Sequence, residues 1–128
     1  MARVTGLGGV FFRSKDPKAL GEWYAKHLGL DIQASFGGSV FMPDAFPAGG
    51  YNIWTPFAAD TTYFGDSGQS YMVNLMVDDL DGALEQVAAG GATLEGEPER
   101  SEFGAFGWFI DPDGNKIELW QPPAPDNA

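Results

Sequence analysis

The stretch Phe106-Gly-Trp-Phe-Ile-Asp-Pro-Asp-Gly-Asn-Lys-Ile-Glu-Leu-Trp-Gln121 consists of two runs rich in aromatic and β-branched residues around a polar turn. Pro112 presets φ for a turn, and Gly114 and Asn115 tolerate positive φ. The pattern therefore predicts a β-hairpin over residues 106–121.

The predicted hairpin brings a carboxylate together with large aromatic side chains. If the loop covers residues 112–114, the antiparallel register of the two strands places Trp108 opposite Glu118. The same register pairs Phe106 with Trp120 and puts all four side chains on one face of the sheet. Such a face is a plausible wall of a binding site. The alternative is a solvated Glu on an edge strand.

Length and charge limit the classes of function. A chain of 128 residues is expected to form one domain with its own core. It has no Cys, which excludes disulfides and thiol catalysis. Its net charge of −11 would repel a phosphate backbone, so we expect no nucleic-acid partner. The N-terminal residues lack the apolar run of a signal peptide and no apolar stretch is long enough to span a membrane, so we expect a cytoplasmic protein with no membrane partner.

Upstream of the hairpin, one order of elements occurs twice. In the first unit, residues 5–57, Asp16 caps a helix that starts at Pro17 and ends at Gly29. The strands predicted for this unit are at residues 10–12, 31–36, 39–42 and 51–57.

The second unit spans residues 71–121. It begins with a strand at 71–77, and Asp79 caps a helix that ends at Gly90-Gly91. A short strand from Thr93 and the hairpin complete it. Residues 58–70 are predicted to be a connecting loop, and residues 122–128 a mobile tail.

The repeat indicates the fold class. Val73 follows Val10, and Asp79 follows Asp16, by 63 residues (73 − 10 and 79 − 16). Two strand–helix–three-strand units form an α+β protein in which two small sheets each cover a helix and curl into an open cup. Cups of this kind bind ligands. A ferredoxin-like α/β domain is the alternative fold, and it would lack the second unit.

Three motifs, in order and at the proper spacing, occur at residues 14–30, 77–84 and 111–119. On these motifs the chain resembles the glyoxalase/bleomycin-resistance/ring-cleaving dioxygenase superfamily, also called vicinal oxygen chelate proteins. The resemblance covers roughly residues 5 to 121. It implies two βαβββ modules that form an open curved sheet in a single domain over residues 1–128, and a homodimer.

Metal-dependent members of that superfamily hold a divalent ion with four ligands, usually His, Glu or Gln. The matching positions here are Gly9, Ile53 or Trp54, Met72 (Tyr71 if the register slips by one), and Glu118. Of these, Glu118 alone is a ligand of the family's type, and a catalytic metal needs about three. The single His, His27, is predicted on the first helix. We therefore expect no cofactor, with a divalent metal as the alternative.

The inner face of the cup follows from the resemblance and from strand alternation. The residues expected to bind a ligand are Phe11, Trp54, Met72, Asn74, Phe106, Trp108, Glu118 and Trp120. Aromatic and Met side chains with few polar groups suit a small apolar or aromatic molecule. Glu118 is the candidate general acid or base.

Two functions stay open for such a cup. The first is binding of a small molecule without a metal. The second is a metal-dependent enzyme of the lactoylglutathione lyase, epimerase or dioxygenase type. In either case the chain's own side chains could instead fill the cup.

Overall fold

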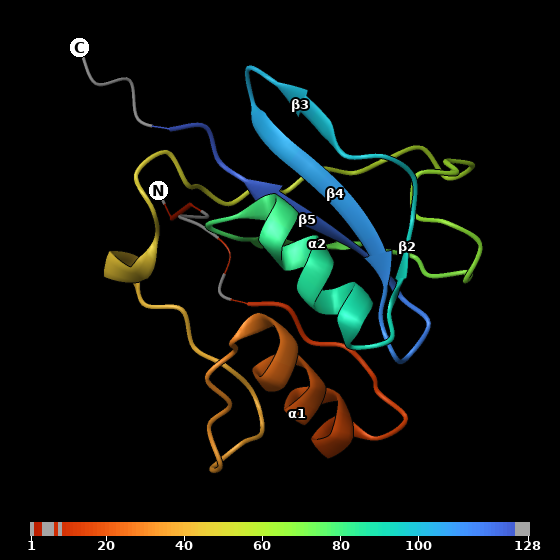
Figure 1. Cartoon of the computed structure of the whole chain (residues 1–128). Helices are drawn as coiled ribbons and strands as arrows, with labels where there is room; N and C mark the ends of the chain where they lie inside the picture. The colour runs from red at the N-terminus through yellow and green to blue at the C-terminus, as the bar shows by residue number, and fades with distance from the viewer. Residues whose placement is uncertain (1, 4–6, 8, 125–128) are drawn as a thin grey trace.

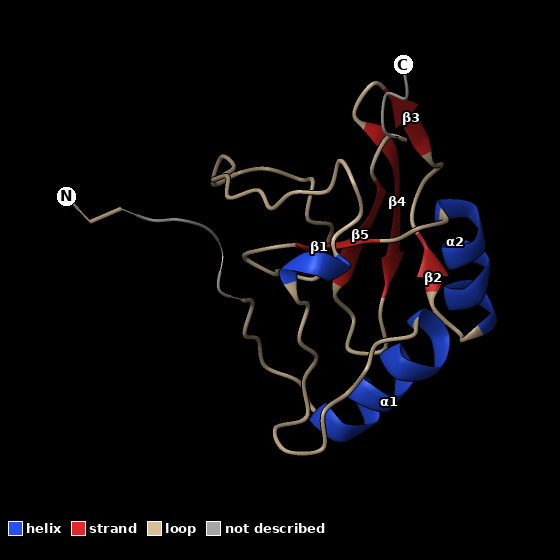
Figure 2. Cartoon of the chain, turned by 90° about the vertical axis from the view of Figure 1, so that its left-hand side faces the viewer, coloured by secondary structure: helices blue, strands red, loops and turns tan. Residues whose placement is uncertain are grey.

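The computed structural model describes residues 2–3, 7 and 9–124 and has the two predicted helices, α1 (Pro17–Leu28) and α2 (Leu80–Ala89). A 3-10 turn, η1, lies at Pro43–Ala45. The strands are β1 (Val73–Met76), β2 (Thr93–Leu94), β3 (Glu99–Ser101), β4 (Gly104–Ile110) and β5 (Lys116–Gln121). Both helices lie on one face of the sheet (Figure 1), and irregular segments lie on the other face (Figure 2).

The five strands form one open sheet in the order β1-β5-β4-β2, with β3 also paired to β4. Strand β1 runs parallel to β5, and β4 and β5 form the predicted antiparallel hairpin. Trp108 pairs with Glu118 and Phe106 pairs with Trp120, so the predicted register is confirmed. The α+β class with an open sheet is confirmed as well.

Both helix starts follow the predicted capping chemistry. The Asp16 carboxylate accepts a hydrogen bond from the Ala19 N–H at 3.1 Å, and Asp79 accepts one from the Gly82 N–H at 3.1 Å. Gly29 ends α1 with a φ of 70°, a conformation that Gly adopts without strain. Among the described residues, no helix has the length and apolar character that a membrane crossing requires.

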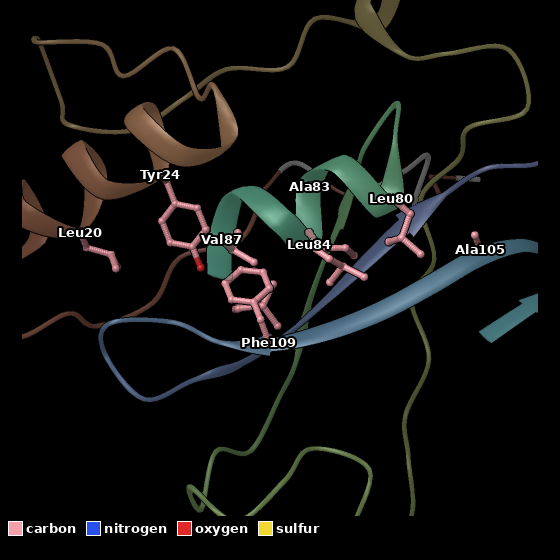
Figure 3. Close-up of a cluster of buried hydrophobic side chains, with 10 residues drawn as sticks. Leu20, Tyr24, Leu80, Ala83, Leu84, Val87, Ala105 and Phe109 are labelled. Carbon is pink, nitrogen blue, oxygen red and sulfur yellow. The ribbon is translucent and has the colours of Figure 1, made fainter. Parts of the chain in front are cut away.

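The hydrophobic core lies between the helices and the sheet (Figure 3). Phe109 of β4, Leu119 of β5, and Leu80 and Val87 of α2 are fully buried. Each such side chain stabilises the fold by about 1.5–3 kcal/mol relative to leaving it in water. The core therefore joins α2 to the hairpin.

The strands predicted for the first unit are wrong in this structure: among the described residues of 9–57, none belongs to a strand. A turn at Gly37 (φ 80°), the η1 turn and a turn at Gly49 (φ 86°) interrupt the segment. Apolar residues of this half, such as Phe11, are exposed. Short apolar runs form strands only where another strand pairs with their backbone groups. β1 is an edge strand, and none of the described residues of 9–57 pairs with its free edge.

The second unit differs from its prediction in detail. Strand β1 begins at Val73 rather than Tyr71, and β3 is an additional short strand. Residues 122–124 carry no regular structure, while residues 125–128 of the predicted tail and residues 5, 6 and 8 of the first unit lie outside the described part of the chain.

Candidate binding face around Glu118

One face of the sheet, the side away from the helices, gathers the side chains that alternate with the core. Phe106 and Trp108 project from β4, Glu118 and Trp120 from β5, and Asn74 from β1. Their strand neighbours, such as Phe109 and Leu119, belong to the core on the other side. We call this surface the Glu118 face.

Glu118 is buried, with 8% of its surface exposed, and its carboxylate accepts hydrogen bonds from three side chains. The Trp108 Nε1–H donates to Oε2 at 2.8 Å, and the Asn74 amide donates to Oε1 at 2.7 Å. The Tyr63 hydroxyl also donates to Oε2. These charge-assisted bonds compensate for the removal of the carboxylate from water.

Tyr63 comes from the segment 58–70, for which the sequence predicts only a connecting loop. Burial, followed by the hydrogen bond to Glu118, raises the pKa of the Tyr63 hydroxyl well above its ordinary value. The hydroxyl therefore stays protonated and remains a donor at neutral pH. A lone Tyr in a loop of Gly, Asp, Ser and Thr is a weak signal for such a role, which is why the sequence did not reveal it.

Lys116 ties this loop to the sheet. Its Nζ donates to the Tyr63 carbonyl at 2.8 Å and lies 5.1 Å from the Tyr63 ring centre and 5.8 Å from that of Trp108. The Gln69 side chain accepts from the Lys116 N–H at 2.7 Å and donates to its carbonyl at 3.0 Å. The loop thus continues the hydrogen bonding of β5 where β1 has not yet begun.

A second aromatic group lies beside the carboxylate. The Phe106 and Trp120 rings stack with centres 6.2 Å apart, and Tyr51 meets the Trp120 ring edge-on at 5.0 Å. Trp120 is 3% exposed and Trp108 is 7% exposed. In this conformation, side chains of the irregular first half and the loop cover the aromatic floor of the face.

Two of the predicted site residues are not part of this cluster. Phe11 is 94% exposed and lines a hollow near α1, and Trp54 is 79% exposed. Their segments form no strand, so the alternation that was expected to turn them inward does not apply. Met72 lies just before β1 and is half-buried.

The residues around Glu118 do not fit a divalent metal. Among the described residues, no three His, Asp or Glu side chains lie close enough together to hold an ion. The neighbours of the carboxylate present hydrogens from hydroxyl, amide and indole groups, and these occupy three of its about four lone-pair sites. His27 packs against Trp23 on α1, with ring centres 5.1 Å apart.

Comparison with known proteins gives related solved structures but no match among curated proteins. TnmS3, an antibiotic binding protein from Streptomyces sp. CB03234, is 27% identical over 86% of this chain and 88% of that chain, with a TM-score of 0.50. A superfamily member from Sphaerobacter thermophilus DSM 20745 is 34% identical over 38% of this chain and 40% of that chain, with a TM-score of 0.35. The alignment thus spans less than half of that protein.

A family model covers most of the sequence. The model of the glyoxalase-like domain matches residues 9–120, which include both helices and all of the hairpin except Gln121. The chain belongs to the glyoxalase-like domain family.

Proposed function

We propose that the chain binds a small, flat, apolar or aromatic molecule on the Glu118 face, without a metal. The observation that carries this proposal is the carboxylate of Glu118, held among Trp108, Asn74 and Tyr63 by three hydrogen bonds. The carboxylate and the aromatic floor together offer a ring-stacking surface with one oriented acceptor, as small-molecule sites commonly do. The resemblance to TnmS3, an antibiotic binding protein, supports a binding role.

The ligand enters by exchange with the covering side chains. Tyr63 is 37% exposed and Tyr51 is 49% exposed, whereas the Trp rings beneath them are buried. Both tyrosines belong to segments without regular structure, whose displacement breaks no strand pairing. A ligand ring then takes the place of the Tyr63 ring, and a donor on the ligand replaces the Tyr63 hydroxyl at Glu118.

Fluorescence of the buried tryptophans tests this proposal. A panel of flat aromatic compounds is titrated into the protein while emission and melting temperature are recorded. We expect at least one compound to quench Trp108 or Trp120 and to raise the melting temperature by mass action. If Trp108→Phe and Trp120→Phe proteins respond to that compound as the wild type does, the ligand binds elsewhere and the proposal is wrong.

We also propose that the protein is a homodimer, in which a second copy covers the apolar side chains of the first half. Phe41 and Ile53 of that half are 59% and 60% exposed, and Trp54 is 79% exposed. Exposed apolar groups at this density are typical of an interaction surface. Sedimentation at micromolar concentration should give twice the mass of one chain, and a monomer at every concentration would disprove the assembly.

A further inference from the structure

A hollow of about 700 Å³ lies beside β1, on the side of the sheet that carries the helices. Val73 and Leu75 of β1 and Ile117 of β5 line it, and Tyr24 of α1 forms another wall. In the strands these three aliphatic residues alternate with Asn74 and Glu118, so they point to the opposite face. The hollow is therefore separate from the Glu118 face.

The polar end of the hollow is a buried carboxylate. Asp111, 5% exposed, lines the hollow together with Tyr24. Its Oδ1 accepts the N–H groups of Asp113 at 2.9 Å and Asn115 at 3.0 Å. Its Oδ2 accepts the Tyr24 hydroxyl at 3.0 Å. Because a carboxylate oxygen has two lone pairs, and Tyr24 is the donor to Oδ2 among the described residues, Oδ2 keeps room for a second donor.

The rim of the hollow is held in place before any ligand arrives. Gln69, on the rim, donates from Nε2 to the carbonyls of Tyr71 at 2.9 Å and Lys116 at 3.0 Å. Its Oε1 accepts the Lys116 N–H at 2.7 Å. A rim that is already ordered reduces the entropy cost of binding.

The charges favour a donor over an anion. Lys116 also lines the hollow, but its Nζ is engaged by the Tyr63 carbonyl at 2.8 Å. Arg13 is exposed, and the buried charged group of the hollow is the Asp111 carboxylate. An anionic head would be repelled there, whereas a hydroxyl or N–H donor would complete the hydrogen bonding of Oδ2.

We propose that this hollow is a second small-molecule site, for a flat apolar compound that carries one hydrogen-bond donor directed at Asp111. Its volume lies within the range of small-molecule sites, roughly 300–1,000 Å³. The ring packs between Leu75 and Ile117 on one side and Phe11 at the mouth. This site does not depend on ligand binding at the Glu118 face.

Matched probes test the donor. We would titrate 2-naphthol and 2-methoxynaphthalene into protein labelled with 15N and at its Leu and Ile methyl groups, and follow the Leu75 and Ile117 methyl resonances and the Trp indole resonances by NMR. The naphthol should shift both, and the ether, which has the same ring but no donor, should bind about tenfold more weakly. Equal affinity of the two probes would overturn the role of Asp111. Shifts confined to the indole resonances of Trp108 and Trp120 would overturn the site itself.

Two variants test the location. Phe11→Ala removes the mouth of the hollow and leaves the fold intact, because that side chain is 94% exposed; the Kd for 2-naphthol should rise by roughly fivefold or more. The control is Phe103→Ala, at another exposed Phe, 59% exposed and in the turn between β3 and β4. If the control weakens 2-naphthol as much as Phe11→Ala does, the binding is nonspecific and the proposal is wrong.

A bulky side chain gives the complementary test. Leu75→Trp should fill the hollow and abolish the 2-naphthol shift at Ile117. Circular dichroism and a melting curve establish that this variant folds. A folded Leu75→Trp protein that still binds 2-naphthol with wild-type affinity would overturn the proposal, and if the variant fails to fold, Phe11→Ala decides.

Discussion

The two halves of the chain carry the same order of predicted elements and differ in what they build. All five strands lie between residues 73 and 121, whereas the described residues of 9–57 contain one helix and a 3-10 turn. Among the described residues, Leu20 and Tyr24 are the two that the first half contributes to the buried core, and both lie on α1. A repeated pattern of elements therefore did not give a repeated structure.

The helix that packs against the hairpin explains part of the difference. The hairpin of β4 and β5 closes a turn over residues 111–115, so its loop costs little entropy. Its inner residues then meet α2, which buries them. The apolar runs of the first half are separated by turns at Gly37 and Gly49 and find no layer of that kind. Strand formation thus depends on a partner as well as on alternation.

The largest expected effect comes from a matched pair of truncations in the two halves. Phe109→Ala empties a fully buried core position and should lower the free energy of unfolding by about 3–5 kcal/mol. Trp54→Ala, at a 79% exposed position of the single chain, should change it by less than about 0.5 kcal/mol when measured at a protein concentration too low for the proposed dimer to form. Urea unfolding of both variants measures the contrast. A large loss at Trp54 at that low concentration would mean that the first half is packed within the single chain, whereas a loss that appears only at higher concentration would support the proposed dimer.

Local signals allowed much of the second half to be predicted. The turn residues around Pro112 fixed the hairpin register, and the Asp16 and Asp79 caps fixed both helix starts. These features depend on residues close in sequence. The runs predicted at residues 31–36 and 39–42 are just as close in sequence, so local spacing and alternation alone do not decide whether strands form; the layer that packs against them does, and local sequence signals do not indicate it.

The residues of the candidate site also fall into two groups, those that local sequence signals predict and those that they do not. Phe106, Trp108, Glu118, Trp120 and Asn74 share a face because the hairpin register and the parallel pairing of β1 place them there. Tyr63 reaches Glu118 across 55 residues from an irregular loop, and no periodicity indicates that contact. Phe11 and Trp54 were assigned by alternation in strands that the structure does not contain.

The hydrogen bond from Tyr24 to Asp111 connects the two halves of the chain, and a rise in pH above 10 should weaken it. Its hydroxyl, buried and bonded to Asp111, has a pKa raised well above its ordinary value, so it stays protonated in the folded protein. Its contribution is complete below pH 10, where the unfolded chain also keeps the proton, and is lost as pH rises further.

Tyr24→Phe should therefore cost about 1.5–3 kcal/mol at pH 8, the range for a hydrogen bond to a charged group. Above pH 10 the difference between wild type and variant should shrink by about 1.4 kcal/mol per pH unit. Urea unfolding from pH 8 to pH 11 measures both quantities. A difference that stays constant across this range would show that Tyr24 is not buried against Asp111.

The Glu118 face allows a smaller change that separates binding from folding. Glu118→Gln keeps the shape and an acceptor for Trp108 and Tyr63, and the Asn74 amide can rotate to meet the new donor. The free energy of unfolding should fall by less than about 1 kcal/mol. Binding of a donor-bearing aromatic ligand should weaken by roughly 1–3 kcal/mol, measured by fluorescence titration. A folded variant that binds such a ligand as tightly as wild type would remove Glu118 from the site.

The smallest expected effect is that of divalent metals on the melting temperature, which we predict to stay unchanged. At the positions that match the family's ligands, Gly9, Ile53 or Trp54, and Met72 offer no His, Glu or Gln, and the fourth, Glu118, is already bonded to three hydrogen donors. An ion would have to displace these donors and would gain a single carboxylate, which does not hold a first-row divalent ion firmly. Melting curves with Ni²⁺, Zn²⁺, Mn²⁺ and Co²⁺ should overlay the metal-free curve in both wild type and Glu118→Gln. A rise in the wild-type melting temperature that Glu118→Gln abolishes would instead identify a metalloenzyme, whose other ligands would have to come from the irregular first half or from a second copy of the chain.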